Sequence, residues 1–117
     1  MKARIILMAV LAALIATSCT EKGTLVVTNK VSNAKIESIS FDDYPIYGEL
    51  LPGQSSEKLE IKELKDKFPF TGPIEFYMTS GSKKVYLKTK QSFQLDYDQD
   101  LVVVITDSTE VINPALE

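Results

Sequence analysis

The sequence predicts an all-β fold: an antiparallel β-sandwich of immunoglobulin-like or similar architecture with six or seven strands. Two observations support this prediction. Short runs in which apolar and polar residues alternate recur along the chain, and turn signals rich in Pro, Gly or Asp separate them at roughly 8–12 residues. The chain has one Cys and no Trp, so the Cys…Trp…Cys pattern of a true immunoglobulin domain is absent and only the architecture is predicted.

The first half of the chain contains two clear strands and two turns. Residues 24–28 are short and rich in β-branched side chains, which predicts the first strand. Residues 29–34 supply turn residues, and residues 35–41 predict the second strand. Residues 42–45 and 51–54 are predicted turns, the second of type II because Pro52 precedes Gly53.

Residues 56–68 fit two interpretations. Leu59 and Ile61 alternate with charged residues, as in a strand, whereas Ile61, Leu64 and Phe68 recur at helical spacing. The strand is favoured because every neighbouring segment has β character. Residues 68–72 are then a predicted loop between prolines.

The second half predicts a hairpin and a buried strand. Residues 74–79 and 84–88 alternate on either side of a Ser-Gly-Ser turn, which predicts a β-hairpin with one apolar face. Phe93 and Leu95 continue the alternation. Residues 101–105 are continuously apolar, which predicts a central strand covered on both faces.

The N-terminus has the pattern of an export signal. Lys2 and Arg4 precede residues 5–16, a run of twelve apolar residues. As a helix this run would span about 18 Å, too short for the ~30 Å core of a bilayer, so it predicts a secretory signal. The sequence Ala16-Thr17-Ser18-Cys19 follows. It resembles the lipobox of bacterial lipoprotein precursors, in the looser form of Bacteroidetes and spirochaetes with Ala where Leu is usual.

The resemblance implies covalent lipid and no other cofactor. In this family the cysteine thiol, here that of Cys19, receives a diacylglyceryl group, a peptidase cleaves before it, and the new amine is acylated. The chain then divides into a signal peptide (1–18), a lipidated tether (19–23), a sandwich domain (24–112) and a C-terminal tail (113–117). Two or three acyl chains anchor a protein firmly. Thr20 is not Asp, so the sorting rule of enteric bacteria favours the outer membrane.

Composition excludes several functions. From Cys19 onward the chain has 11 Lys, no Arg and 16 acidic residues, a net charge of −5, which argues against binding nucleic acid or anionic lipid through the protein surface. There is no His, the one thiol is used by lipid, and no phosphate-binding Gly-rich loop is present. Carboxylate pairs could hydrolyse glycosides, but a domain this small offers little cleft. The protein is therefore expected not to be an enzyme.

An acidic turn is a candidate metal site. Asp96, Asp98 and Asp100 match positions 1, 3 and 5 of a calcium-binding EF-hand loop, and Asp107 matches position 12. Position 6, which requires Gly for its sharp turn, is Leu101. A solvated turn without metal is the favoured interpretation.

Loop aromatics are a candidate ligand site. Tyr44 and Tyr47 could stack on a sugar ring while Asp42 and Asp43 accept hydrogen bonds from its hydroxyls. The favoured alternative is that these rings, together with the phenylalanines of residues 68–70, cover the open ends of the sandwich.

A last motif lies near the C-terminus. Asp107-Ser108-Thr109 is similar to the O-glycosylation sequon of exported Bacteroidetes proteins, which implies a glycan on Ser108; the favoured alternative is a plain polar strand end. Together these features predict a lipid-anchored, non-catalytic envelope protein that acts as a protein-interaction or structural module. The alternative is a carbohydrate-binding or adhesion module that uses the loop with Tyr44 and Tyr47.

Overall fold

A computed structural model describes residues 21–114 of the chain. The predicted signal peptide and the lipobox with Cys19 lie outside the described residues. The described part is nearly all β, which confirms the predicted fold class. Its elements are β1 (Glu21–Lys30), β2 (Lys35–Phe41), β3 (Tyr44–Ile46), β4 (Leu59–Glu63), the 3₁₀ turn η1 (Lys65–Lys67), β5 (Phe70–Gly72), β6 (Ile74–Ser80), β7 (Lys83–Thr89), β8 (Phe93–Leu95), β9 (Asp100–Thr106) and β10 (Val111–Ile112).

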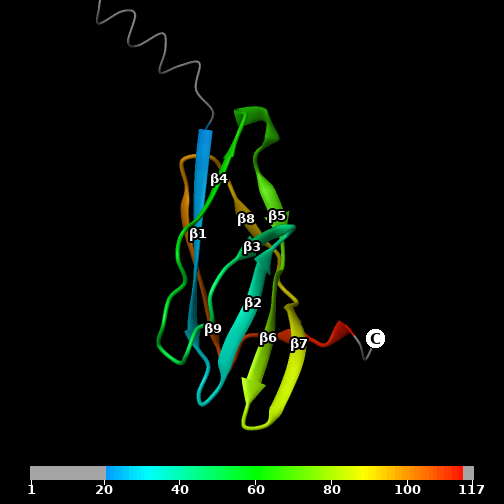
Figure 1. Ribbon diagram of the computed structural model, residues 1–117. Helices are drawn as coiled ribbons and strands as arrows, with labels where there is room; N and C mark the ends of the chain where they lie inside the picture. Colours follow the sequence, from blue (N-terminus) through cyan, green and yellow to red (C-terminus); the bar gives the residue numbers. More distant parts are fainter. Residues whose placement is uncertain (1–20, 115–117) are drawn as a thin grey trace, which may run out of the picture.

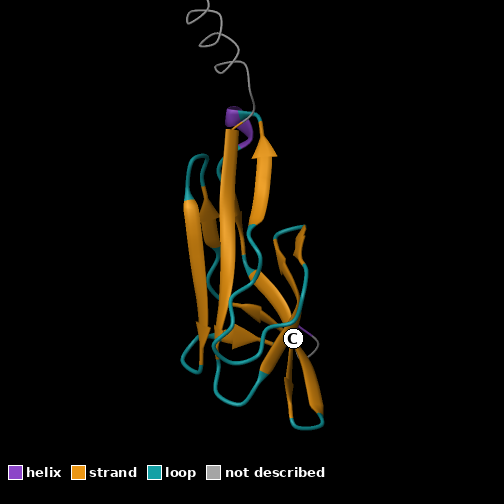
Figure 2. Cartoon of the chain, turned by 60° about the vertical axis from the view of Figure 1, so that its left-hand side comes forward, coloured by secondary structure: helices purple, strands orange, loops and turns teal. Residues whose placement is uncertain are grey.

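Three sheets build the sandwich (Figure 1). The first has the strand order β4-β1-β9, the second β10-β7-β6-β2-β3, and the third is the pair β5-β8. Strand pairs are antiparallel except β1 and β9, which run parallel with Leu25 opposite Leu101. Figure 2 shows the β6–β7 hairpin extending beyond the rest of the body at the end opposite to η1.

The core forms where alternate side chains of the main sheets face one another. The buried residues are Leu25, Val27, Val31, Ala34, Ile36, Ile39, Phe41, Ile46, Leu50, Ile61, Phe68, Ile74, Phe76, Leu95, Val103 and Ile105. Full burial of one such Leu, Ile or Phe side chain contributes about 1.5–3 kcal/mol relative to its exposure. This gain fixes the register, because a slip by one residue would turn each of these side chains toward water.

A β-bulge in β2 explains an irregular hydrophobic spacing. Ile36 and Ile39 are three residues apart and would lie on opposite faces of a regular strand, yet both are buried. The register shifts between Glu37 and Ser40, and Ser38 takes the left-handed φ of +51°. The extra residue turns Ile39 back into the core.

Several predicted elements are confirmed. Residues 59–63 form strand β4 in the segment where helix and strand competed, followed by η1. The hairpin of β6 and β7 is present, and β2 has the predicted bounds. In the predicted type II turn, the N–H of Gln54 donates to the carbonyl of Leu51 at 3.0 Å, and Gly53 has the positive φ of +90° that this turn requires.

Three predicted boundaries were wrong because short strands depend on their partners. β1 begins at Glu21, inside the predicted tether 19–23, since β4 pairs with it as far as Glu63. Tyr44 belongs to β3 and not to a turn, since it pairs with Phe41. The predicted loop over residues 68–72 contains β5, which pairs with β8. The partners of β1 and β5 are distant in sequence and leave no local signal, whereas β3 is too short to show an alternation of its own.

The prediction for residues 101–105 was wrong in one important respect. They lie in β9, at the edge of the β4-β1-β9 sheet and not at its centre. Val103 and Ile105 face the core, whereas Val102 is 60% exposed and Val104 is 45% exposed. The other sheets cover only one face of β9, which leaves the second face to solvent.

Candidate functional site

Two surface features are candidate binding sites: a groove beside Tyr47 and the free edge of β9. The groove is open, has a volume of about 540 Å³, and lies between the bulge of β2 and the segment after β3. Tyr47 borders it with a side chain that is 79% exposed. An exposed aromatic ring of this kind offers a flat face for stacking.

The bulge of β2 shapes the wall of this groove. Ser38 and Ser40 line it, together with the carboxylate residues Glu37 and Glu49. A non-glycine residue with positive φ, such as Ser38, costs on the order of 1–3 kcal/mol, and such positions are concentrated at functional sites. The groove therefore combines an aromatic face, hydroxyl groups and carboxylates.

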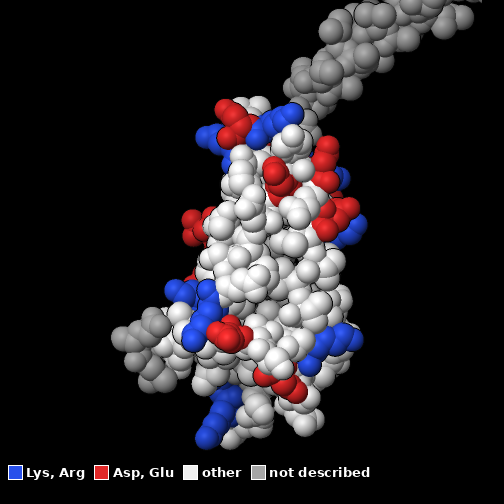
Figure 3. Space-filling model, turned by 180° about the vertical axis from the view of Figure 1, so that it is seen from behind, with Lys and Arg blue, Asp and Glu red and all other residues white. Residues whose placement is uncertain are grey.

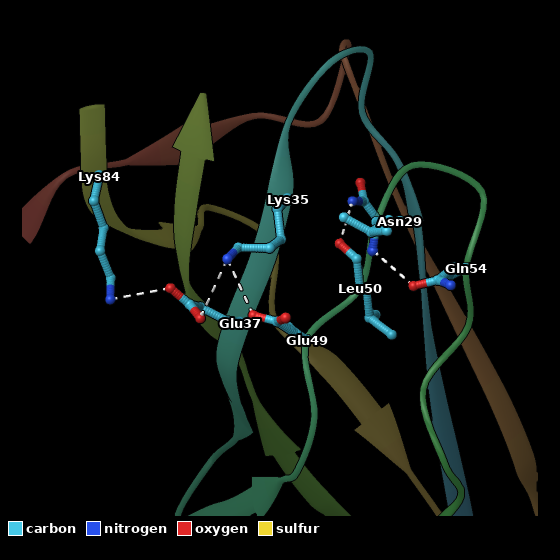
Figure 4. Close-up of polar contacts among 8 residues, drawn as sticks. Asn29, Lys35, Glu37, Glu49, Leu50, Gln54 and Lys84 are labelled. Carbon is cyan, nitrogen blue, oxygen red and sulfur yellow. Dashed lines mark hydrogen bonds and ion pairs between the residues drawn. The ribbon is translucent and has the colours of Figure 1, made fainter. Parts of the chain in front are cut away.

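Ion pairs hold the two carboxylates of the groove in place (Figure 4). The Nζ of Lys35 lies 3.0 Å from Glu49 Oε2 and 3.9 Å from Glu37 Oε2. The Nζ of Lys84 lies 3.0 Å from Glu37 Oε1. The hydrogen bond from Lys84 lowers the pKa of Glu37, and the hydrogen bond to Glu49 raises the pKa of Lys35. The network keeps these groups charged and oriented, although exposed pairs add little stability.

The structure separates the residues of the predicted sugar site. Tyr44 is half-buried and packs edge-on against Phe70, with ring centroids 5.7 Å apart. Burial raises the pKa of its hydroxyl. Asp42 and Asp43 are exposed in the turn between β2 and β3 and do not line the groove beside Tyr47. Of the four predicted residues only Tyr47 lies at the groove, because Tyr44 pairs within β3 whereas Tyr47 follows the strand.

The loop aromatics other than Tyr47 form one cluster. Phe70 packs against Phe68 with centroids 5.0 Å apart, and Phe68 contacts Tyr97 at 6.3 Å. The Nζ of Lys65 lies 4.6 Å from the centre of the Tyr97 ring, a cation–π contact. Rings at this end of the sandwich pack against the hydrophobic core.

In the structure, three of the acidic residues of the candidate calcium loop have separate hydrogen-bond partners. Asp100 accepts a hydrogen bond from the hydroxyl of Thr24 at the start of β9. Asp107 lies beyond the other end of β9 and accepts hydrogen bonds from the N–H and the hydroxyl of Ser32 at 2.9 and 2.8 Å. These two hydrogen bonds lower the pKa of Asp107. Asp96 accepts the N–H of Tyr97 at 2.8 Å. Among residues 21–114, no three acidic, Cys or His side chains are grouped to hold a metal ion.

Ser108 lies on an exposed turn after β9. Its N–H donates to the hydroxyl of Thr106 at 3.1 Å. The hydroxyl of Ser108 is therefore on the surface, where a modifying enzyme could reach it.

The second feature, the free edge of β9, is not predicted by the sequence. The N–H of Thr24 in β1 donates to the carbonyl of Gln99 at 2.9 Å. In a parallel ladder, backbone groups of alternate residues point to the same neighbour. The odd-numbered residues of β9 therefore face β1, and the backbone N–H and C=O groups of Val102 and Val104 point to the free edge.

The same residues carry exposed apolar side chains. Val26 of β1 lies opposite Val102 in the register, on the outer face of the sheet. We call Val26, Val102 and Val104 the outer valine patch. Figure 3 shows an expanse of uncharged surface across the middle of the molecule, with charged groups toward its two ends. An edge strand whose residues 101–105 carry no charge is unusual, because monomeric proteins commonly protect such edges with charges, prolines or bulges.

Comparison of the chain with models of protein families, with curated proteins and with solved structures gave no match. The described residues contain no helix that is both long and apolar enough to cross a membrane.

Proposed function

We propose that the mature protein is a lipid-anchored, non-catalytic lipoprotein of the bacterial envelope that binds another envelope protein through the edge of β9. The observation that carries the proposal is the exposure of Val102 and Val104 on a strand whose backbone groups are unpaired at one edge. The sequence of β9 is that of a strand covered on both faces. A partner that adds a strand beside β9 would pair with the free backbone groups, and its side chains would pack beside the two valines.

The chemistry of β9 defines the partner segment. Strand addition uses backbone hydrogen bonds for affinity and alternate side chains for specificity. The partner is therefore an extended polypeptide segment with small apolar residues at alternate positions, which would extend the outer valine patch. Residues 101–105 carry no charge, so charged residues on the partner would lose hydration without gaining an ion pair.

The lipid anchor argues against a second copy of this chain as the partner. A symmetric antiparallel pair of β9 strands would place the two β1 strands antiparallel as well, since β1 and β9 run parallel. The two Glu21 residues would then lie at opposite ends of the joined sheet, about 30 Å apart for ten residues of strand. Only Thr20 separates Glu21 from Cys19, so both lipids could not enter the same membrane.

Replacement of Val102 tests the edge of β9. The Val102→Pro variant removes an N–H that faces the free edge and leaves the bonds to β1 in place. The matched control Val102→Thr keeps the N–H and the β-branched shape. A photoreactive residue at position 104, introduced in cells, should crosslink one envelope protein in the wild-type and Val102→Thr backgrounds and lose it in Val102→Pro. Equal crosslinking in all three backgrounds, or none in any, contradicts the proposal.

The anchor itself has a separate test. A globomycin-type inhibitor of the signal peptidase should make the precursor accumulate, and Cys19→Ala should abolish attachment of the lipid. Mass spectrometry of the native protein should find acyl chains on Cys19, and fractionation should place it in the outer membrane. An unmodified thiol would show that the protein is not a lipoprotein.

Carbohydrate binding is the second candidate function, and the groove beside Tyr47 favours it. A sugar ring could stack on Tyr47 while Glu37 and Glu49 accept hydrogen bonds from its hydroxyls. The hydroxyl of Ser38 could donate or accept a further hydrogen bond. A glycan array tests this function. Tyr47→Ala should abolish a positive signal, whereas Tyr47→Phe, which keeps the ring, should retain most of it.

Glycosylation of Ser108 is proposed on the sequon and on the exposure of its turn. Mass spectrometry of the protein from its native host should show a glycan that Ser108→Ala removes.

A further inference from the structure

One end of the molecule lies next to the predicted lipid attachment. We call it the anchor-proximal tip and define it as the first residues of β1, η1 with the preceding Leu64, and the turn at residues 96–99. Figures 1 and 2 show η1 beside the start of β1. Glu21 pairs with Glu63 at this end, and the carbonyl of Lys22 accepts the N–H of Asp98 at 2.8 Å. These contacts make the tip one connected surface.

The tip carries an exposed apolar residue among charged residues of both signs. Leu64 is 57% exposed, and the next three residues, Lys65, Asp66 and Lys67, are exposed as well. Lys22 and Lys62 lie opposite each other on the neighbouring strands. Figure 3 shows side chains of both charges gathered at the end where β1 begins. An exposed Leu beside Lys side chains is the combination that amphipathic surface helices place at a bilayer interface.

The chain between tip and lipid is too short to separate them. Cys19 and Glu21 are two residues apart, which spans at most about 7 Å of extended chain. The lipid attached to Cys19 must enter the acyl region of the membrane, so Glu21 cannot lie far above the headgroups. Since β1 begins at Glu21, the end of the domain at which β1 begins therefore faces the bilayer.

We propose that the anchor-proximal tip rests on the bilayer, with Leu64 in the headgroup region and the lysines beside the phosphates. This inference rests on the proposed lipidation of Cys19. The lipid supplies the affinity, because the body has a net charge of −5 and a single Leu buries little area. The tip supplies the orientation, because Leu64 directly precedes η1, and η1 is followed by Phe68, which is buried in the core.

The orientation has a consequence for the edge of β9. β9 runs parallel to β1, so Asp100 is near the membrane and Thr106 is distant from it. The β6–β7 hairpin lies at the end of the molecule away from the tip (Figure 2). A strand added beside β9 would run along the membrane normal, within reach of a protein on the same membrane.

Fluorescence at two single-cysteine positions tests the orientation. Cys19 is the one natural cysteine of the chain and carries the lipid, so an introduced cysteine can be labelled alone. The lipidated full-length mature protein carries the environment-sensitive dye NBD either at Leu64→Cys or at Ser82→Cys, the exposed turn of the distal hairpin. Both proteins are reconstituted into phosphatidylcholine–phosphatidylethanolamine vesicles with and without brominated acyl chains.

The two positions should behave differently. NBD at position 64 should show a blue-shifted emission and lose intensity with brominated lipid, whereas NBD at position 82 should show neither change. Lys67→Cys repeats the measurement at a second tip position, and circular dichroism verifies the fold of each variant. Solvent-like emission at positions 64 and 67 in protein that floats with the vesicles overturns this inference alone. Protein that does not float with the vesicles overturns the proposed anchor and this inference with it.

Discussion

The buried side chain of Asn29 gives the sharpest test of how the fold is held together. Asn29 is completely buried. Its Nδ2 donates to the carbonyls of Ala34 and Leu50, both at 2.9 Å, and its Oδ1 accepts the N–H of Val31 at 2.9 Å. One side chain thus ties the end of β1 to the following turn and to the chain segment before Gln54 (Figure 4).

The expected cost of Asn29→Ala follows from these three bonds. Each hydrogen bond contributes about 1 kcal/mol net, and a buried partner left unsatisfied costs about 1–3 kcal/mol. The free energy of unfolding should therefore fall by about 3 kcal/mol or more, a large part of the 5–15 kcal/mol of a typical domain. The Asn29→Asp variant keeps the acceptor for Val31 but loses both donors and places a carboxylate against two carbonyl oxygens, so it should lose at least as much.

Urea unfolding of the non-lipidated Cys19→Ala protein, monitored by circular dichroism, measures this change. With a slope of about 1–3 kcal/mol per molar urea, a loss of 3 kcal/mol lowers the midpoint by about 1–3 M. A loss below about 0.5 kcal/mol for either variant, the usual range of surface substitutions, would refute the assignment of Asn29 as the connection between these segments.

Three further predictions concern packing and protonation. Val103→Ala should lower the free energy of unfolding by about 2 kcal/mol, whereas Val102→Thr on the exposed face should change it by less than about 0.5 kcal/mol in urea titrations. The hydroxyl of Tyr86 donates to Glu75 at 2.5 Å, which raises its pKa to about 12. Because the pKa of Tyr86 in the folded protein lies above the ordinary value of 10.0, this bond stabilises the fold below pH 10, and its contribution is lost as the pH rises to 12. The absorbance of tyrosinate should show one tyrosine that titrates late, and Tyr86→Phe should remove that late titration. Gly23→Ala should destabilise by more than 1 kcal/mol in thermal unfolding, because its Cβ would lie 2.7 Å from a backbone oxygen of the neighbouring turn.

The local pattern of the chain was sufficient for the main strands and turns. Alternation located β2 and the β6–β7 hairpin, and the Pro52-Gly53 pair located a turn, because side-chain period and turn chemistry act over a few residues. β3 and β5 were missed for the opposite reason. Three residues carry no period of their own, and their strand character comes from partners that only the folded chain supplies.

The candidate site depended more on tertiary structure than the fold did. Tyr44 and Tyr47 are close in sequence, yet pairing in β3 directs Tyr44 against Phe70 and leaves Tyr47 beside the groove. The carboxylates that share the groove with Tyr47 come from β2 and from the segment after β3, a combination that spacing along the chain does not indicate.

By itself the sequence determined the fold class and the expectation of a lipid anchor, because composition, alternation and a short contiguous motif are local properties. The tertiary structure alone decided that residues 101–105 lie at an edge and that β1 begins beside η1. Both features depend on which strands become neighbours. The pairing of strands is determined by burial of the whole core and not by the local sequence of a single strand.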